Sequence, residues 1–147
     1  MAESMFDLRA ERVLDAPPDA VFDTHTNPEM WKSLGSDSRC DLRIGGLWTI
    51  VGGQPGAKPF RQTNRFTKID RPHQISFAST LVLPDDSVLE REVDATIESL
   101  ENGRTKMVIV QRGFPSRESR DALVPAFPSI FDGLERLARA HLGSGAR

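Results

Sequence analysis

An arginine on the apolar side of a predicted strand is the residue of this sequence best suited to bind an anion. Residues 88–100 alternate in character, with Leu89, Val93 and Ile97 on one parity and mostly acidic residues on the other. Arg91 falls on the apolar parity. A guanidinium that faces an apolar interior needs an anionic partner or several acceptors, and its planar fork suits a carboxylate. Two interpretations remain open: Arg91 binds a ligand carboxylate, or a strand end or bulge lets it reach solvent or a nearby acid.

Two further titratable side chains stand out by position, and for each we favour a structural role. Arg12 interrupts the apolar face of another predicted strand, which favours an ion pair within the fold. His25 lies near the end of a predicted helix, one turn after Phe22, where an imidazolium would stabilise the negative end of the helix dipole. Catalysis by His25 is the alternative.

The sequence contains no recognisable catalytic or metal-binding motif. Its acidic residues fall in turns or on the solvated side of strands, so no acid–base pair emerges. None of the three histidines has a second His or a Cys at the spacing of a metal site. A nucleophile elbow and a phosphate-binding glycine loop are missing as well. We therefore predict no metal and no other cofactor, we name no catalytic residue, and we favour a protein that is not an enzyme.

The aromatic residues supply apolar walls with few polar groups. The sequence has eight Phe and two Trp but no Tyr, so only the indoles carry a hydrogen-bond donor. Phe127 and Phe131 are four residues apart in a predicted helix and therefore share a face. Each ring is either part of the close-packed core or part of a cavity wall, and we predict that several line a ligand cavity with the arginine described above. The candidates for this cavity are Arg91, Trp31, Trp48, Phe66, Phe77, Phe127 and Phe131.

The elements that must position these residues are strands in the middle of the chain and a helix at its end. Two short helices are expected at 18–26 and 29–34, and an amphipathic helix is expected from residue 128. Because an antiparallel sheet with one apolar face must be covered, this helix should lie on the sheet, and strong curvature would leave a pocket between them. The fold class is therefore α+β. The predicted strands are 6–14, 47–51, 60–69, 74–83, 88–100 and 107–110.

The pair Gly45-Gly46 predicts a tight hairpin turn. Paired glycines supply the positive φ angles of such a turn, and Leu42 and Ile44 before it share one parity. We expect two short strands within residues 41–48, joined at the glycines, at the point where the sheet begins to curl around the helix.

Composition narrows the class of protein further. The 147 residues, 38% of them hydrophobic and 27% charged, suit one globular domain over residues 1–147 with an ordered core from about 5 to 142. A formal net charge of -2 gives no basic surface for nucleic acid. Cys40 is the single cysteine, so an internal disulfide is excluded. Neither a signal peptide nor a run long enough to span a bilayer is present, so we expect a cytoplasmic protein.

An ordered set of short motifs runs along the whole chain. The motifs are Arg12-Val13-Leu14-Asp15-Ala16-Pro17, Val21-Phe22, Thr26-Asn27-Pro28-Glu29, Trp31, Asp41-Leu42-Arg43-Ile44-Gly45-Gly46, Trp48, Gly113-Phe114-Pro115-Ser116 and Leu134-Glu135-Arg136-Leu137. Together they resemble the START-like (SRPBCC) superfamily, in the branch related to the C-terminal domain of the activator of Hsp90 ATPase. The resemblance implies a helix-grip fold, in which a curved antiparallel sheet wraps around a long C-terminal helix and encloses a cavity.

The start of the last helix departs from this branch. Members often carry Gly-Trp early in that helix, whereas here Ala126-Phe127 stands nearest that place, between Pro125 and Pro128. Proline breaks or kinks a helix, so we expect a distorted start and an altered cavity mouth.

The function expected from these observations is the binding of a small, largely apolar ligand, with an acidic group held by Arg91. Members of the superfamily include ligand binders, polyketide cyclases and chaperone regulators, and a fold does not decide among them. The alternatives are an enzyme of the polyketide cyclase or dehydratase type that uses the same cavity, and a regulator of an Hsp90-type chaperone. We expect an apolar or amphipathic molecule as the partner, no nucleic acid and no membrane span; a homodimer and a chaperone partner stay open.

Overall fold

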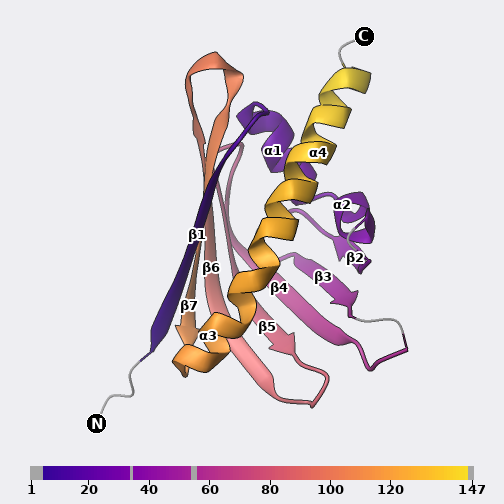
Figure 1. Cartoon of the computed structure of the whole chain (residues 1–147), viewed down its shortest axis with the longest axis vertical. Coiled ribbons are helices and arrows are strands. Elements are labelled where there is room, and N and C mark those ends of the chain that lie inside the picture. The colour runs from indigo at the N-terminus through magenta and orange to yellow at the C-terminus, as the bar shows by residue number, and fades with distance from the viewer. Residues whose placement is uncertain (1–4, 34, 54–55, 146–147) are drawn as a thin grey trace.

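The computed structural model describes residues 5–33, 35–53 and 56–145, and a seven-stranded sheet forms its centre (Figure 1). The strands, in chain order, are β1 (Phe6–Leu14), β2 (Asp37–Cys40), β3 (Leu47–Gly52), β4 (Phe60–Asp70), β5 (Gln74–Val82), β6 (Val88–Ser99) and β7 (Thr105–Phe114). Their order across the sheet is β1-β7-β6-β5-β4-β3-β2, and all neighbours are antiparallel. Strands that follow one another from β2 to β7 are therefore neighbours in space, as short connections favour.

One long helix covers one face of this curved sheet. Helix α4 (Phe127–Gly145) runs across the sheet in Figure 1, and α1 (Pro18–His25) and α2 (Pro28–Ser33) lie beside its later turns. Two short helices after the first strand and one long helix at the end confirm the α+β helix-grip architecture. Apolar and polar residues alternate along the strands, so one face of the sheet is apolar. This face must be covered, and the helices cover it.

Strand β6 shows how the sequence specifies which face is covered. Its odd-numbered residues from Leu89 to Ile97 are buried, whereas Glu90, Glu92 and Thr96 between them are exposed. This period of two places Arg91 on the covered side of the sheet with the apolar residues.

The predicted hairpin within residues 41–48 is wrong in its first strand. The strand that pairs with β3 is β2, and the stretch from Asp41 to Gly46 is the connection between them. Leu42 and Ile44 are therefore not strand residues but side chains exposed at 42% and 62%. Strand β2 escaped prediction because Asp37, Arg39 and the serine between them carry no apolar alternation, so pairing with β3 and not burial defines it.

The end of β7 also differs from prediction. Strand β7 does not stop at Val110 but continues to Phe114, because it pairs with β6 as far as Arg112 and with β1 as far as Phe114. After it, α3 (Arg117–Leu123) passes through the 3₁₀ turn η2 (Val124–Ala126) into α4. Pro125 lies in that turn, so the expected distortion of the helix start is present.

Candidate functional site

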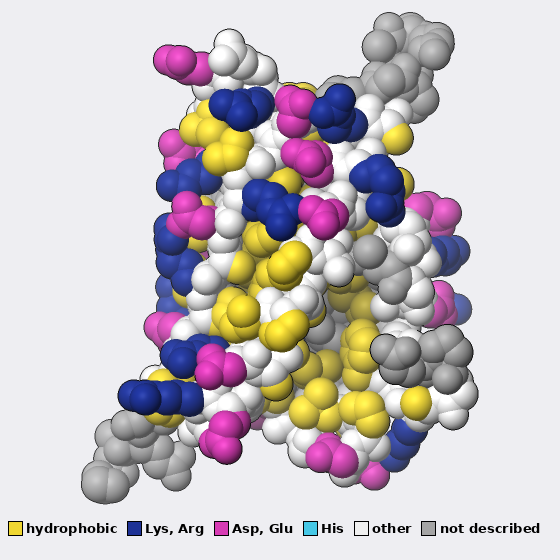
Figure 2. Space-filling view, viewed as in Figure 1, with side chains coloured by type: hydrophobic (Ala, Val, Ile, Leu, Met, Phe, Trp, Pro, Cys, Tyr) yellow, Lys and Arg dark blue, Asp and Glu magenta, His cyan; other side chains and the backbone are white. Residues whose placement is uncertain are grey.

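A cavity of about 680 Å³ lies between α4 and the covered face of the sheet. This volume is in the range of about 300–1,000 Å³ typical of small-molecule sites. Figure 2 shows the cavity as a hollow, ringed by hydrophobic side chains, beside the first turns of α4. The apolar part of its wall comes from the sheet and from the helices that cover it, and includes Trp31, Trp48, Ile50, Phe60, Phe77, Leu81, Val93, Ala95, Ile109, Leu123, Phe127 and Ile130.

Arg91 is a buried cation on this wall. Only 5% of the residue is exposed. Its Nη2 donates to the Ser79 hydroxyl at 2.9 Å and its Nη1 donates to the Gln111 side-chain carbonyl, while its Nε has no partner among the described residues. Both acceptors are neutral. Burial lowers the pKa of Arg91 to about 10, so the guanidinium is still charged at neutral pH.

A neighbouring arginine shows what a paired guanidinium looks like in the same sheet. Arg112, on β7, points to the opposite, solvated face and forms an ion pair with Asp94. The hydrogen bond that Arg112 donates to this carboxylate raises the pKa of Arg112. The ion pairs found among the described residues include none to Arg91, and no Asp or Glu belongs to the cavity wall. Arg91 therefore brings to the cavity a positive charge that has no counter-charge among the described residues.

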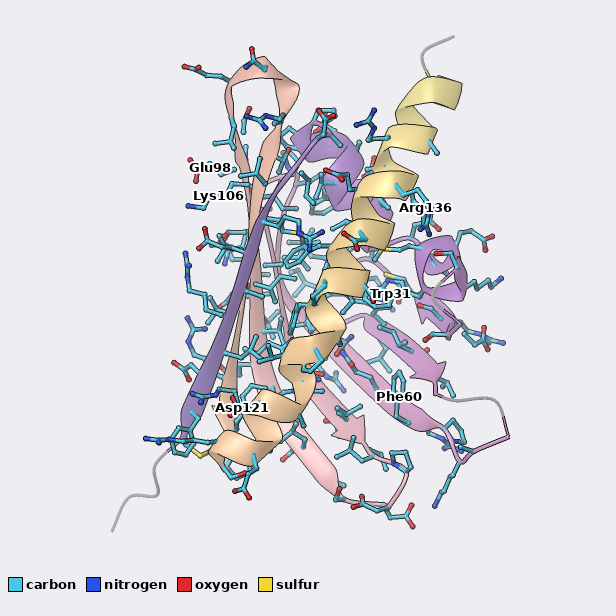
Figure 3. All side chains as sticks on the ribbon, in the orientation of Figure 1. Trp31, Phe60, Glu98, Lys106, Asp121 and Arg136 are labelled. Carbon is cyan, nitrogen blue, oxygen red and sulfur yellow. The ribbon has the colours of Figure 1, made fainter. Side chains whose placement is uncertain are left out.

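A cluster of rings from α1, α2 and β3 forms another part of the cavity wall. We call His25, Trp31 and Trp48 the aromatic corner. The His25 ring lies 5.2 Å from the Trp48 ring and 6.2 Å from the Trp31 ring, measured between centroids. Figure 3 places Trp31, from α2, and Phe60, from β4, on the same side of α4.

His25 is neutral at physiological pH because it is buried in this corner. It is 4% exposed, and desolvation lowers the pKa of its imidazole to about 4. Its Nδ1 is buried without a hydrogen-bond partner among the described residues. The interpretation of His25 as an imidazolium that stabilises the helix dipole is therefore wrong: it is the last residue of α1, but its ring packs inward against Trp48.

Five of the seven predicted cavity residues line the cavity and two do not. Arg91, Trp31, Trp48, Phe77 and Phe127 belong to its wall. Phe66 is absent from it because its ring stacks behind Trp48, at 6.0 Å between centroids and 10° between planes. Phe131 is absent because it packs farther along α4, beneath the guanidinium of Arg12.

Sequence reasoning missed the partners of Arg91 and the position of His25. Gln111 lies beyond the predicted end of its strand, and Ser79 shares the inward parity of β5 although serine is a weak indicator of burial. Gln62, from β4, also lines the cavity and donates to the side-chain carbonyl of Asn64 at 3.0 Å. Polar residues at inward positions of a strand are the pattern that could have revealed this set.

Arg12 holds the structural position that the sequence suggested. Its guanidinium forms an ion pair with Asp132 of α4 and lies 5.3 Å from the centre of the Phe131 ring. It therefore joins β1 to α4 and does not line the cavity.

Comparisons with known proteins agree with this architecture. Residues 15–139 match the model of a family described as activator of Hsp90 ATPase homolog 1-like protein. No curated protein is significantly similar to the sequence. The helices of the described residues include none that is both long and apolar enough to cross a membrane.

Solved structures from several bacteria share the fold. A protein of Rhizobium leguminosarum has a TM-score of 0.79 at 21% identity, over 93% of this chain and 96% of that chain. A protein of Chromobacterium violaceum has a TM-score of 0.76 at 21% identity, over 90% and 96% of the two chains. At these identities the likeness concerns the fold alone. Because the family model spans most of the sequence, the chain belongs to the activator of Hsp90 ATPase homolog 1-like family, within the START-like superfamily.

Proposed function

We propose that this protein binds a small, largely apolar carboxylic acid in the cavity, with the carboxylate on Arg91. The observation that carries the proposal is a charged guanidinium, 5% exposed, on a largely apolar wall whose described residues include no acidic side chain. Membership of a family with a ligand-binding fold is consistent with this role.

The energetics of a buried charge support a carboxylate at this position. An isolated buried charge is costly, and neutral acceptors such as Ser79 and Gln111 compensate for only part of the lost hydration. A guanidinium has five N–H donors, so donors remain for two carboxylate oxygens. The ligand would then supply the counter-charge that the described protein residues do not, while the rings around it would bury the apolar body.

The experiment replaces Arg91 with methionine and measures ligand binding. Both tryptophans line the cavity and the sequence has no tyrosine, so intrinsic fluorescence reports on the site. For Arg91→Met we expect dodecanoic acid to bind about 10- to 150-fold more weakly, the equivalent of about 1.5–3 kcal/mol for hydrogen bonds to a charged group. Arg112→Met, which removes the solvated arginine, is the matched control and should bind the acid as the wild type does.

A change in the ligand separates the charge from the apolar contacts. Dodecanol lacks the carboxylate, so it should bind wild type and Arg91→Met about equally. If both variants bind the acid with wild-type affinity, Arg91 is not part of the site. Native mass spectrometry of the purified wild type provides a second test, because a retained acid would appear as a defined mass increase.

A catalytic role in the same cavity is the second candidate, and His25 is the observation that favours it. A buried imidazole within a ligand cavity is a common general base. However, an imidazole with a pKa of about 4 is a weak base, and a general base works best when its pKa is near the working pH. Turnover of a bound acid by the wild type and its loss in His25→Gln would support the enzyme over the binding protein.

A further inference from the structure

The aromatic corner contains a polar group that the fold leaves unused. Both indole N–H groups have protein partners: Trp31 Nε1 donates to the His25 carbonyl at 3.1 Å, and Trp48 Nε1 donates to the Ser38 hydroxyl at 3.2 Å. The imidazole of His25 has no such partner at Nδ1. Among the three side chains of this corner, only His25 therefore has a ring nitrogen left to bind a ligand.

His25 Nδ1 is one of three such nitrogens among the described residues. Among the described residues, the buried side-chain nitrogens without a hydrogen-bond partner are His25 Nδ1, Asn64 Nδ2 and Arg91 Nε. His25 and Arg91 both line the cavity. Because buried polar groups are normally paired, His25 and Arg91 are residues of this cavity wall whose hydrogen-bonding capacity the described protein leaves incomplete.

The strand register separates these two positions. Trp48, which contacts His25, pairs with Asn64 on β4; Asn64 pairs with Ser79, and Ser79 pairs with Arg91. Trp48 and Arg91 are therefore three strand spacings apart, about 14 Å along the sheet at about 4.8 Å per spacing, and nearer to each other straight across the curved sheet. A ligand that reaches both corners must carry its polar groups on well-separated atoms, with an apolar body between them.

We propose that the ligand carries a hydroxyl group at the end opposite its carboxylate, and that His25 binds this hydroxyl in the aromatic corner. The inference rests on the proposed function, since it extends the ligand from an apolar acid to an ω-hydroxy acid or an equivalent hydroxylated aromatic acid. His25 is a binding residue in this proposal and transfers no proton.

A hydroxyl fits this corner better than a second charged group does. A neutral imidazole has one donor and one acceptor nitrogen, and a hydroxyl can accept from one or donate to the other. A second carboxylate would lie beside Trp31 and Trp48 without a cation. An ammonium group would likewise lack a counter-charge, because no Asp or Glu lines the cavity.

The test compares matched ligand series on three proteins. The ligands are octanoic, decanoic, dodecanoic and tetradecanoic acids, their ω-hydroxy counterparts, and the ω-amino acids of the same lengths. The proteins are wild type, His25→Phe and His25→Gln, and tryptophan fluorescence reports the binding. His25→Phe keeps an aromatic ring against Trp48, whereas His25→Gln keeps hydrogen-bonding groups. His73→Gln, in an exposed turn, is the control.

We expect at least one ω-hydroxy acid to bind wild type and His73→Gln more tightly than its parent acid. In His25→Phe the same hydroxy acid should bind about tenfold or more weakly while the parent acid is unaffected, because a buried hydroxyl is then left unpaired. His25→Gln should recover part of the loss, which a purely structural role of His25 would not produce. If His25→Phe does not fold, the preference for the hydroxy acid over its parent acid is compared between wild type and His25→Gln instead. A smaller preference in His25→Gln supports the inference, and an equal preference overturns it.

The outcomes distinguish this inference from the function on which it rests. If the parent acids bind but no chain length shows a preference for the hydroxyl, the inference is overturned and the acid-binding function stands. If the ω-amino acids bind best, the corner is a cation site and the inference is likewise wrong. If no acid of any series binds wild type, both proposals fail together.

Discussion

Arg91 and His25 show how one cavity can give opposite charge states to two basic residues. Burial lowers the pKa of both groups, to about 10 for Arg91 and to about 4 for His25. Because neutral pH lies between these values, the guanidinium keeps its proton and the imidazole does not. The cavity therefore presents a fixed positive charge at one position and a neutral hydrogen-bonding group at another.

The low pKa of His25 predicts a loss of stability in acid. The unfolded chain has the ordinary pKa of 6.5, so between pH 6.5 and about 4 it binds a proton at His25 that the folded protein does not bind. The contribution of neutral His25 to the free energy of unfolding is thus complete above pH 6.5 and is lost as the pH falls to about 4. Its size is about 3 kcal/mol, from about 1.4 kcal/mol per pKa unit.

Urea denaturation of wild type and His25→Gln at pH 7.5 and at pH 4.5 checks this prediction. The difference in stability between the two proteins should change by about 2–3 kcal/mol between these pH values, in favour of the variant at low pH. His73→Gln should follow wild type at both. A difference that is independent of pH would mean that His25 titrates normally in the folded protein.

Residue parity in the sequence was enough to place Arg91 on the inward face but not to identify its surroundings. Alternation of apolar and polar residues is a local property of the sequence, and it is clear from Leu89 to Ile97. The acceptor Gln111 belongs to another strand, and the burial of His25 depends on Trp48 and on the helices around it. Such contacts join residues far apart in the chain, and no local pattern encodes them.

At the scale of elements, the conformation of the connection between β2 and β3 depends on the close packing of Gly46 against the backbone of Asp41 more than on a hairpin turn. A Cβ on Gly46 would lie 2.2 Å from the backbone oxygen of Asp41. Gly45 has a positive φ of 80°, but nothing lies within 4 Å of where its Cβ would be. The two neighbouring glycines are therefore needed for different reasons, although the sequence presents them as one motif.

This difference predicts opposite tolerance to substitution. Gly46→Ala should lower the free energy of unfolding by about 2–3 kcal/mol, because the backbone of the connection must shift to make room for the methyl group. Gly45→Asn should change it by less than about 1 kcal/mol, since Asn tolerates a positive φ and the space is empty. Thermal and urea denaturation of both variants provide the measurement, and equal losses would contradict the assignment.

Helix α3 begins at a capping box that helps to hold the cavity mouth. The Ser116 hydroxyl accepts from the Ser119 N–H at 3.0 Å, and the Ser119 hydroxyl lies 3.3 Å from the Ser116 N–H. Ser116 is therefore the N-cap residue of α3. Because α3 leads through η2 into the mouth of the cavity, its stability matters for the site.

Loss of this cap should cost about 1 kcal/mol. Ser116→Ala removes the acceptor of the N-terminal N–H group, and such substitutions typically destabilise by about 0.5–2 kcal/mol. Ser116→Asp keeps an acceptor and adds a negative charge at the positive end of the helix, so it should restore most of the stability. Denaturation curves of the two variants check the expectation; no difference between them would show that the box contributes nothing.

At the scale of the whole molecule, the order of strands and helices was predictable but the cavity was only inferred. Amphipathic patterns indicate which faces of the sheet and of α4 meet. They also predict the order of a strand, two short helices, further strands and a last helix. The volume between two such faces depends on the curvature of seven strands and on where α4 begins. Pro125 and Pro128 indicated that beginning, but packing of α3, η2 and α4 determines which side chains surround the opening.

The position of the cavity opening predicts how fast a ligand enters. Ser129 is exposed, lies in the first turn of α4 and lines the cavity, so Ser129→Phe should narrow the mouth without adding a tryptophan that would disturb the fluorescence. Ala140→Phe, on an exposed position of the same helix and outside the cavity wall, is the matched control. In stopped-flow fluorescence, dodecanoic acid should associate with Ser129→Phe about tenfold more slowly, within the range seen for variants of one binding site.

Dissociation should slow by a similar factor, because entry and exit share the same opening and the bound contacts at Arg91 are unchanged. The equilibrium affinity should then stay near that of wild type and of Ala140→Phe. Unchanged rates in Ser129→Phe would mean that ligands reach the cavity by another route, for example by separation of α4 from the sheet.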